Sequence, residues 1–129
     1  MRLLLDTQVA LWWLTASPRL PKPSRELMAS SPCAVSVASV WEVALKHRLG
    51  KLPIAAARFR DEMRLAGATV LSITDEHVLT RVKAAESHRD PFDRLLLSVA
   101  EAENLVLLTA DAALIALGRG EPRLPIRNA

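Results

Sequence analysis

The chain of 129 residues has one cysteine, no tyrosine and no long uninterrupted hydrophobic segment. A single cysteine, Cys33, excludes an internal disulfide and a zinc site built from several cysteines. Because it lies in an apolar run, we expect it to be a small core residue. Aromatic residues make up only 4% of the chain, which gives no sign of a stacking platform for single-stranded bases. No apolar run is long enough to span a bilayer, so we expect no membrane association.

The size and composition are those of one folded domain. Half of the residues are hydrophobic, which argues against disorder, and the length predicts a single domain over residues 1–129. Asp6 follows the start of the chain too closely for the apolar stretch of a signal peptide, which predicts a cytoplasmic location. The formal net charge of +3 is small and widely spread, so it permits nucleic-acid binding without demonstrating it.

Short apolar runs alternate with segments of helical periodicity along the whole chain. We expect buried strands over residues 2–5 and 33–37, further strands over 69–73 and 105–108, and a short edge strand over 124–126. Helices are expected over residues 9–14, 24–30, 39–49, 54–66, 75–86 and 91–103, and in a short segment from Asp111. This alternation predicts an α/β fold of three layers, α/β/α, in which helices cover both faces of a central parallel sheet of four to five strands.

Four acidic residues lie where an expected strand ends or the next helix begins: Asp6, Glu42, Asp93 and Asp111. The carboxyl ends of parallel strands gather at one edge of a sheet, so residues far apart in sequence can converge there. Crowded carboxylates do not stay ionised together without a counter-charge. Hard divalent cations supply that charge and bind oxygen ligands. The pattern therefore indicates a metal-dependent phosphoryl-transfer site.

Each acid also has a simpler explanation as part of a helix start. Asp6 and Asp111 stand at expected helix starts, where aspartate is a favoured cap. The segment 39–42 matches the capping-box pattern, which from the pattern alone is the stronger explanation of its glutamate. Asp90 fits the cap position of its helix, which leaves Asp93 in the first turn free for another task. If all the acids are caps, the domain is a non-catalytic interaction module.

Four segments of the chain carry a family resemblance: Leu3–Leu14, Ser36–Lys46, His88–Leu96 and Leu108–Asp111. The third contains the sequence Asp-Pro-Phe-Asp-Arg at residues 90–94. Together they resemble the PIN-domain ribonucleases, specifically the VapC-like toxins of bacterial toxin–antitoxin pairs. The segments occur in the order and at the distances of that family and span nearly the whole chain. The resemblance therefore implies one PIN-like domain.

The resemblance assigns roles to the polar residues of these segments. It implies that one or two Mg²⁺ or Mn²⁺ ions are held by an acidic quartet: Asp6, Glu42, Asp93 and Asp111. Thr109 and Thr7 would be supporting polar residues, and Asp90 would be a cap or a group just outside the ligands. The implied reaction is hydrolysis of RNA phosphodiester bonds by metal-activated water, which leaves a 3′-hydroxyl and a 5′-phosphate.

Basic side chains near the acids are candidates for contacts with RNA phosphates. Arg94, directly after Asp93, is the first choice, followed by Lys46 and Arg89. Lys46 also stands one turn after Glu42, where it suits an ion pair within the helix. The resemblance further implies a homodimer and a cognate antitoxin whose tail covers the site. Tryptophan is enriched at protein interfaces, and we expect at least one of the three tryptophans there.

The three histidines are His47, His77 and His88. No two of them have the spacing of metal ligands. We therefore expect them at the surface or at an interface and not in the metal site.

Two other phosphoryl-transfer families fit the sequence less well. A phosphatase of the haloacid dehalogenase kind would carry Asp-x-Asp after the first strand, where this chain has Asp6-Thr7-Gln8. A response-regulator receiver would need paired acids at the same place and a lysine late in the sheet. The non-catalytic interaction module therefore remains the main alternative to a ribonuclease.

Overall fold

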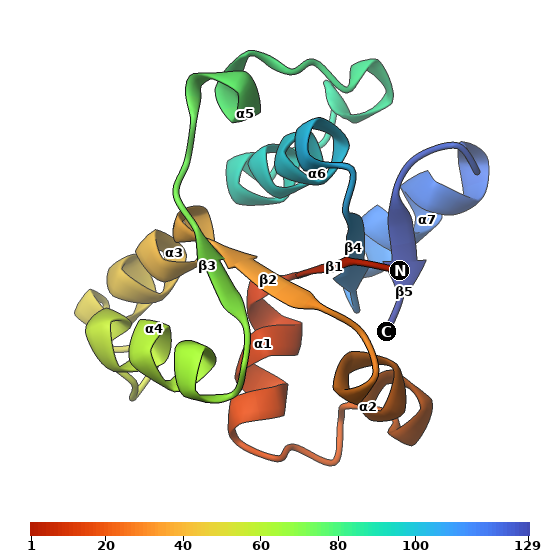
Figure 1. The fold of residues 1–129 in the computed structure, drawn as a ribbon. Helices are drawn as coiled ribbons and strands as arrows, with labels where there is room; N and C mark the ends of the chain where they lie inside the picture. The colour runs from red at the N-terminus through yellow and green to blue at the C-terminus, as the bar shows by residue number, and fades with distance from the viewer.

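Five parallel strands form the centre of the molecule, in the order β3-β2-β1-β4-β5 (Figure 1). The computed structural model describes all residues, 1–129. The strands are β1 (Leu3–Leu5), β2 (Cys33–Ser36), β3 (Thr69–Leu71), β4 (Val106–Thr109) and β5 (Ile126–Asn128). The predicted α/β class, with a parallel sheet of four to five strands, is confirmed.

Helices cover both faces of this sheet. They are α1 (Thr7–Leu14), α2 (Lys22–Ala29), α3 (Val37–Arg48), α4 (Ala56–Leu65), α5 (Asp75–Leu79), the 3₁₀ turn η1 (Lys83–Ala85), α6 (Pro91–Glu103) and α7 (Ala112–Gly120). In Figure 1, α1, α2 and α4 lie on one side of the strands and α5 and α6 on the other. These layers are the predicted α/β/α arrangement. None of the helices combines the length and the apolar character needed to cross a membrane.

Alternate strand residues supply two separate hydrophobic cores. Leu3 and Leu5 point into the core beneath α1, α2 and α4, whereas Leu4 points into the core beneath α6 and α7. All three leucines are fully buried, and burial of each stabilises the fold by about 1.5–3 kcal/mol. A strand buried on both faces has no polar side to mark it, which explains the uninterrupted apolar runs of this sequence. Cys33 is 8% exposed in the first core, as predicted.

The helix expected over residues 75–86 is the largest departure from the predicted elements. Helix α5 ends at Leu79, and only the turn η1 follows it before α6. Thr74 caps α5 as predicted, since its Oγ1 accepts a hydrogen bond of 3.2 Å from the backbone N–H of His77. His77 is 1% exposed and its Nε2 lies 2.6 Å from Glu103 Oε1, so the surface position predicted for it was wrong. This short helix is anchored by a buried histidine rather than by an apolar face.

The remaining predicted helices agree with the observed ones to within one or two residues at each end. The final edge strand lies slightly later than expected, at Ile126–Asn128. Pro125 stands just before it and contributes only its carbonyl, which accepts a 2.7 Å hydrogen bond from the N–H of Leu107. Proline lacks a donor for the strand ladder, so this position outside the strand suits it.

Candidate metal centre

The polar site lies at the carboxyl ends of β1 and β4, in the middle of the sheet. Strand β1 pairs with β2 on one side and with β4 on the other, so the chain connections leave this point in opposite directions. Such a reversal opens a crevice outside the strand ends, where α/β proteins bind ligands. Asp6 follows β1 directly, and its N–H donates a 3.0 Å hydrogen bond to the carbonyl of Leu108 in β4. The first acid is thereby fixed beside the crevice.

All four predicted acids line one cavity of about 350 Å³. Asp6, Glu42 and Asp93 are 6%, 8% and 9% exposed, and Asp111 is partly exposed at the mouth. Other polar residues that line the cavity are Thr7, Gln8, Lys46 and Asp90. The structure therefore brings together acids that the sequence places in four separate segments.

Asp6 and Glu42 do not cap helices. Asp6 stands at the N-cap position of α1, but its side chain makes no capping hydrogen bond. Helix α3 is capped by Ser36, whose Oγ accepts a 3.0 Å hydrogen bond from the N–H of Ala38. The capping box predicted for residues 39–42 was therefore wrong, because the N-cap of the helix lies three residues earlier than that pattern indicates. Glu42 lies inside α3, and helix capping does not explain its burial.

Asp90 and Asp111 do cap helices. Asp90 Oδ1 accepts hydrogen bonds from the N–H groups of Phe92, at 2.8 Å, and Asp93, at 3.4 Å, as predicted. Asp111 Oδ2 accepts one from the N–H of Leu114 at 2.9 Å. The second oxygen of Asp111 has no such partner, so this residue combines a capping role with a place in the cavity.

Thr109 connects two of the acids. Its Oγ1 donates a hydrogen bond of 2.6 Å to Asp6 Oδ2 and accepts one of 3.0 Å from the N–H of Asp111. Thr109 is fully buried at the end of β4. The hydroxyl therefore sets the position of Asp6 relative to the turn that carries Asp111.

Glu42 is held at both oxygens. Thr7 Oγ1 lies 2.7 Å from Glu42 Oε1 and 2.8 Å from Ser39 Oγ. Since the Thr7 hydroxyl has one proton, it donates to the carboxylate and accepts from Ser39. Lys46 Nζ lies 2.8 Å from Glu42 Oε2, which is the predicted ion pair within the helix. Ser39 belongs to this network although the sequence pattern had placed it in a capping box.

Burial changes the acidity of two carboxyl groups in the cavity. It raises the pKa of Asp93 to about 6, and although the hydrogen bond from His88 opposes this rise, repulsion from neighbouring carboxylates adds to it. Burial also raises the pKa of Asp6, against the hydrogen bond from Thr109 and together with repulsion from Glu42. Buried carboxyl groups that repel one another are stabilised by a bound cation. The donors of the quartet are all oxygens, which fit a hard divalent ion such as Mg²⁺ or Mn²⁺.

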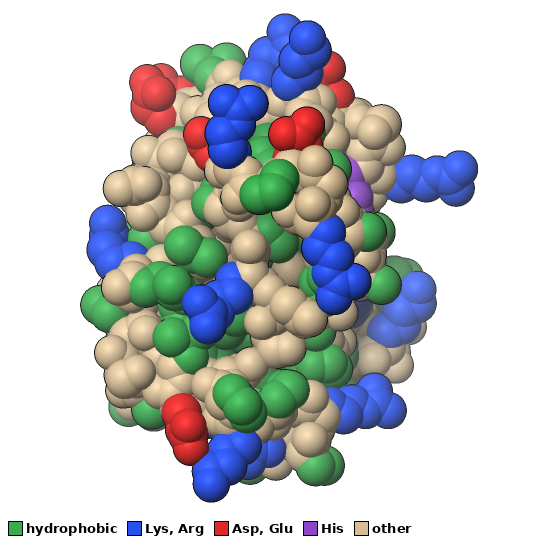
Figure 2. Space-filling model, turned by 90° about the vertical axis from the view of Figure 1, so that its right-hand side faces the viewer, with side chains coloured by type: hydrophobic (Ala, Val, Ile, Leu, Met, Phe, Trp, Pro, Cys, Tyr) green, Lys and Arg blue, Asp and Glu red, His purple; other side chains and the backbone are tan.

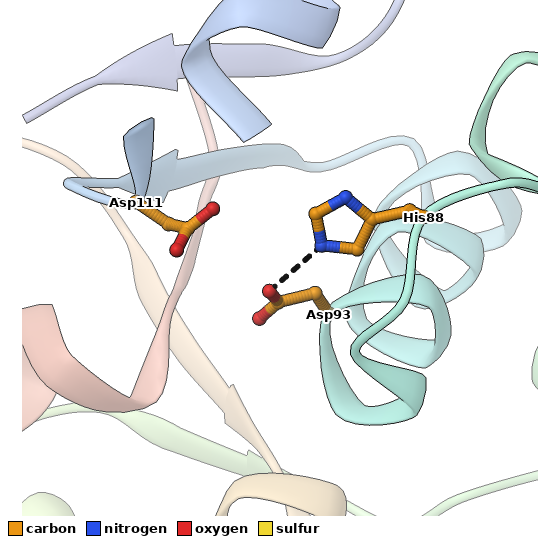
Figure 3. Close-up of side chains that lie close together, drawn as sticks. All are labelled: His88, Asp93 and Asp111. Carbon is orange, nitrogen blue, oxygen red and sulfur yellow. Dashed lines mark hydrogen bonds and ion pairs between the residues drawn. The ribbon is translucent and has the colours of Figure 1, made fainter. Parts of the chain in front are cut away.

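His88 lies against Asp93, with its Nε2 2.9 Å from Asp93 Oδ2. Figure 3 shows His88, Asp93 and Asp111 converging from the loop before α6, the first turn of α6 and the turn after β4. One ligand atom of each lies within 4.8 Å of the others. His88 was predicted at the surface or at an interface, and it lines a surface hollow with its side chain 12% exposed, but the sequence spacing of the histidines gave no sign of its contact with Asp93. Its place two residues before the capping Asp90 was the available signal.

The PIN domain family model matches residues 3–120. The chain belongs to the PIN domain family. Within that family, ribonuclease VapC16 from Mycobacterium tuberculosis (strain ATCC 25618 / H37Rv) is 42% identical over 50 residues. The matched segment covers 36% of this chain and 36% of the length of that relative.

Solved structures similar to this PIN domain include VapBC toxin–antitoxin proteins. VapBC-1 from nontypeable Haemophilus influenzae has a TM-score of 0.66 and 17% identity, with 99% of this chain and 98% of that chain covered. VapBC2 from Rickettsia felis, bound to a promoter DNA fragment, has a TM-score of 0.63 and 18% identity, with coverage of 99% and 98%. VapBC-5 from Mycobacterium tuberculosis has a TM-score of 0.56 and 22% identity, with coverage of 98% and 96%. These neighbours confirm the PIN-like α/β/α fold, and the findings together confirm the resemblance to VapC-like proteins.

Basic side chains of this PIN domain differ in their distance from the acids. Lys46 lines the cavity of the quartet, and Arg89 lines an adjoining hollow of about 500 Å³. Arg94 lines neither of them, because one residue along a helix turns the side chain by about 100° from the direction of Asp93. On the face shown in Figure 2, Lys and Arg side chains stand at separate places and form no continuous strip. Lys46 and Arg89 are therefore better placed near the acids than Arg94, the first choice from the sequence.

Proposed function

We propose that this PIN domain is a metal-dependent endoribonuclease and the toxin component of a toxin–antitoxin pair. The convergence of four acids from distant segments in one cavity carries this proposal. Two of them, Asp6 and Glu42, are buried without a capping role, although burial of a carboxylate is costly unless something compensates its charge. Membership of the PIN domain family and the match to a ribonuclease support the same activity.

The quartet Asp6, Glu42, Asp93 and Asp111 would hold Mg²⁺ or Mn²⁺. When bound, such an ion offsets charge on phosphoryl oxygens and lowers the pKa of water. The chain contributes the fixed positions of the ligands. Thr109 orients Asp6, and Thr7 and Lys46 together hold both oxygens of Glu42. Ligands held in this way need little rearrangement when they bind an ion.

RNA is the substrate that we propose for this centre. A polyanion is attracted by cationic groups that stand beside an acidic pocket, and phosphate contacts position the chain for cleavage. Lys46 stands at the cavity and Arg89 at the adjoining hollow, so the two flank the carboxylates that line both, which are Asp90, Asp93 and Asp111. A backbone phosphate placed over these carboxylates would have a cationic side chain on either side.

We also propose an antitoxin partner and a homodimer. Similar solved structures are VapBC toxin–antitoxin proteins, which supports the first of these partners. Next to Glu42, the side chain of Trp41 is 59% exposed and packs edge-on against Phe92, with ring centroids 5.7 Å apart. An exposed tryptophan of this kind suits a protein interface.

Cleavage of total cellular RNA tests the activity. We expect discrete fragments in the presence of Mg²⁺ or Mn²⁺, no cleavage in EDTA, and recovery when the metal is restored. Asp93→Asn should reduce the rate at least about 100-fold, because it removes one charged ligand. Asp61→Asn, at an exposed position on α4, is the matched control and should cleave at the native rate.

The outcomes separate the two functions considered for this fold. Cleavage that persists in Asp93→Asn would come from a contaminating nuclease. A native protein that binds its antitoxin but cuts no RNA with either metal would be a non-catalytic interaction module.

A further inference from the structure

We propose that His88 supplies a nitrogen ligand to this metal centre and forms, with Asp93 and Asp111, a cation position that favours transition-metal ions over Mg²⁺. The inference rests on the proposed metal-dependent function and deepens it. It concerns the hollow of about 500 Å³ that these three residues line and that Asp6 and Glu42 do not. The oxygen-only quartet does not include this nitrogen.

The spacing of the three side chains fits a coordination sphere. His88 Nε2 and Asp93 Oδ2 are 2.9 Å apart, and ligand atoms about 2.1 Å from an ion and at right angles to each other are about 3.0 Å apart. One ligand atom of Asp111 lies within 4.8 Å of both. In Figure 3 its carboxylate points toward the His88–Asp93 pair. An ion can replace the proton shared by the histidine and the aspartate without a change of backbone.

The three residues are held by independent local structures. The N–H of His88 donates a 3.0 Å hydrogen bond to the carbonyl of Ala85, which fixes the loop before α6. Asp93 is in the first turn of α6 and is 9% exposed. Asp111 is anchored by Leu114 through Oδ2 and leaves its other oxygen available. A metal position needs such pre-arranged ligands, because loosely held ones lose affinity on ordering.

Asp93 and Asp111 also line the cavity that contains Asp6 and Glu42. Asp90, which caps α6, lines both hollows as well, so the two share three carboxylates and each adds its own donors. One side adds the oxygens of the buried acids, and the other adds the imidazole of His88. Arg89 lies on the histidine side, where it can contact a phosphate that approaches the shared carboxylates.

The chemistry of the donors predicts which ions bind on the histidine side. Imidazole is a ligand for transition-metal ions, whereas Mg²⁺ prefers oxygen and keeps most of its water. A set of one nitrogen and two carboxylates therefore discriminates against Mg²⁺. Mn²⁺ accepts both kinds of donor and is paramagnetic, which makes it the probe for this position.

Electron spin-echo spectroscopy of Mn²⁺ bound to the full-length protein tests the proposal directly. We expect a nitrogen coupling from a directly bound imidazole in the native protein, and its replacement by a ¹⁵N pattern when histidine is isotopically labelled. His88→Asn should lose the coupling and reduce the preference for Mn²⁺ over Mg²⁺ about tenfold in competition titrations. His47→Asn is the matched control, since that exposed imidazole contacts the carbonyl of Leu52 outside the site.

Each outcome decides the proposal separately from the ribonuclease activity. Mn²⁺ that binds to the native protein and depends on Asp6, but shows no nitrogen coupling, would overturn the role of His88 and leave the proposed function intact. A coupling that remains in His88→Asn would also overturn it. A native protein that binds no Mn²⁺ would overturn it too, and the RNA cleavage assay would then decide the proposed function. The labelled native protein gives the answer even if the variant does not fold.

Discussion

Thr109 Oγ1 donates a hydrogen bond of 2.6 Å to Asp6 Oδ2, although 103 positions separate the two residues in the chain. The bond joins the carboxyl ends of β1 and β4. These are the adjacent central strands from which the chain connections lead toward opposite edges of the sheet. Both residues are buried, and the bond works against the effect of burial on the pKa of Asp6. The pairing of two central strands thus sets the orientation of the first acid of the candidate metal centre.

Thr109→Val tests this relationship, since it removes the hydroxyl and keeps the shape of the side chain. We expect a loss of about 1–3 kcal/mol in the free energy of unfolding, because a buried carboxylate loses its hydrogen-bond donor. The pKa of Asp6 should rise further and the affinity for Mn²⁺ should fall. Urea unfolding at pH 8, with and without Mn²⁺, measures both effects. Thr80→Val is the control, since that hydroxyl bonds only to the carbonyl of Glu76, and equal stability of both variants would contradict the prediction.

The raised pKa of Asp93 predicts that the metal-free protein loses stability as the pH rises. The folded protein holds the Asp93 proton up to about pH 6, whereas the ordinary pKa of the group is 3.8. Between these values the folded state binds more protons than the unfolded state, so the free energy of unfolding falls by about 3 kcal/mol as the pH increases through this window. Above about pH 6 the loss in the free energy of unfolding that Asp93 causes is nearly complete.

Urea unfolding in EDTA between pH 4 and pH 8 measures this slope. Asp93→Asn should flatten the profile and be more stable than the native protein at pH 8 in the absence of metal. Asp61→Asn, at an exposed position, should keep the native slope. A native profile that is flat across the window would show that Asp93 is not destabilised by its surroundings.

Divalent ions should raise the melting temperature, because they bind the folded quartet and not the unfolded chain. At 100 times the dissociation constant the gain in stability is about 2.7 kcal/mol. Asp6→Asn should lose most of this gain, because Asp6 is one of the buried acids of the cavity. Glu26→Gln, at an exposed ion pair on α2, should keep it. Thermal unfolding with and without Mg²⁺ or Mn²⁺ is the measurement, and a melting temperature indifferent to both ions would argue against a metal centre.

Lys46→Gln should weaken RNA binding about equally for all sequences and lower the salt dependence by about one unit of slope, as expected for the loss of one phosphate contact. Fluorescence anisotropy in an Asp6→Asn background, which prevents cleavage, measures the affinity at several salt concentrations. Lys22→Gln is a close control, because Lys22 also pairs with a glutamate one turn away but is highly exposed on α2. If both substitutions had the same effect, Lys46 would have no specific place in RNA binding.

Much of the fold could be predicted because its three central strands, β1, β2 and β4, are buried along almost their whole length. The apolar run Leu3–Leu5 and the acid that follows it mark both a strand and its functional end without any knowledge of neighbours. The predicted helix over 75–86 failed because its apolar residues do not share one buried face: Val78 is 64% exposed, whereas Ala85 lies in the core beneath α6 and α7. A buried histidine anchors this segment instead, through a contact with Glu103 that is 26 positions distant. Periodicity alone contains no sign of such a contact.

In the site too, interactions between residues close in the sequence could be predicted, and contacts between distant residues could not. Asp90 was recognised as a cap because capping involves only the next few residues. Glu42 was ambiguous because Ser39 fits a capping box, whereas in the folded protein Ser39 faces Thr7, 32 positions earlier. The role of His88 depends on how the loop before α6 turns its side chain back toward Asp93. Sequence spacing does not reveal that turn.

The pairing of β4 with β1 also determines when the acidic cavity is completed during synthesis. The strands β1, β2 and β3 and the six helices α1 to α6 precede β4 in the chain, yet β4 supplies the central neighbour of β1 and is closely followed by Asp111. Domains emerge from the ribosome beginning with their N-terminal residues, so a growing chain carries Asp6 and Glu42 long before it carries Thr109. A chain that does not yet include β4 therefore has no assembled acidic cavity.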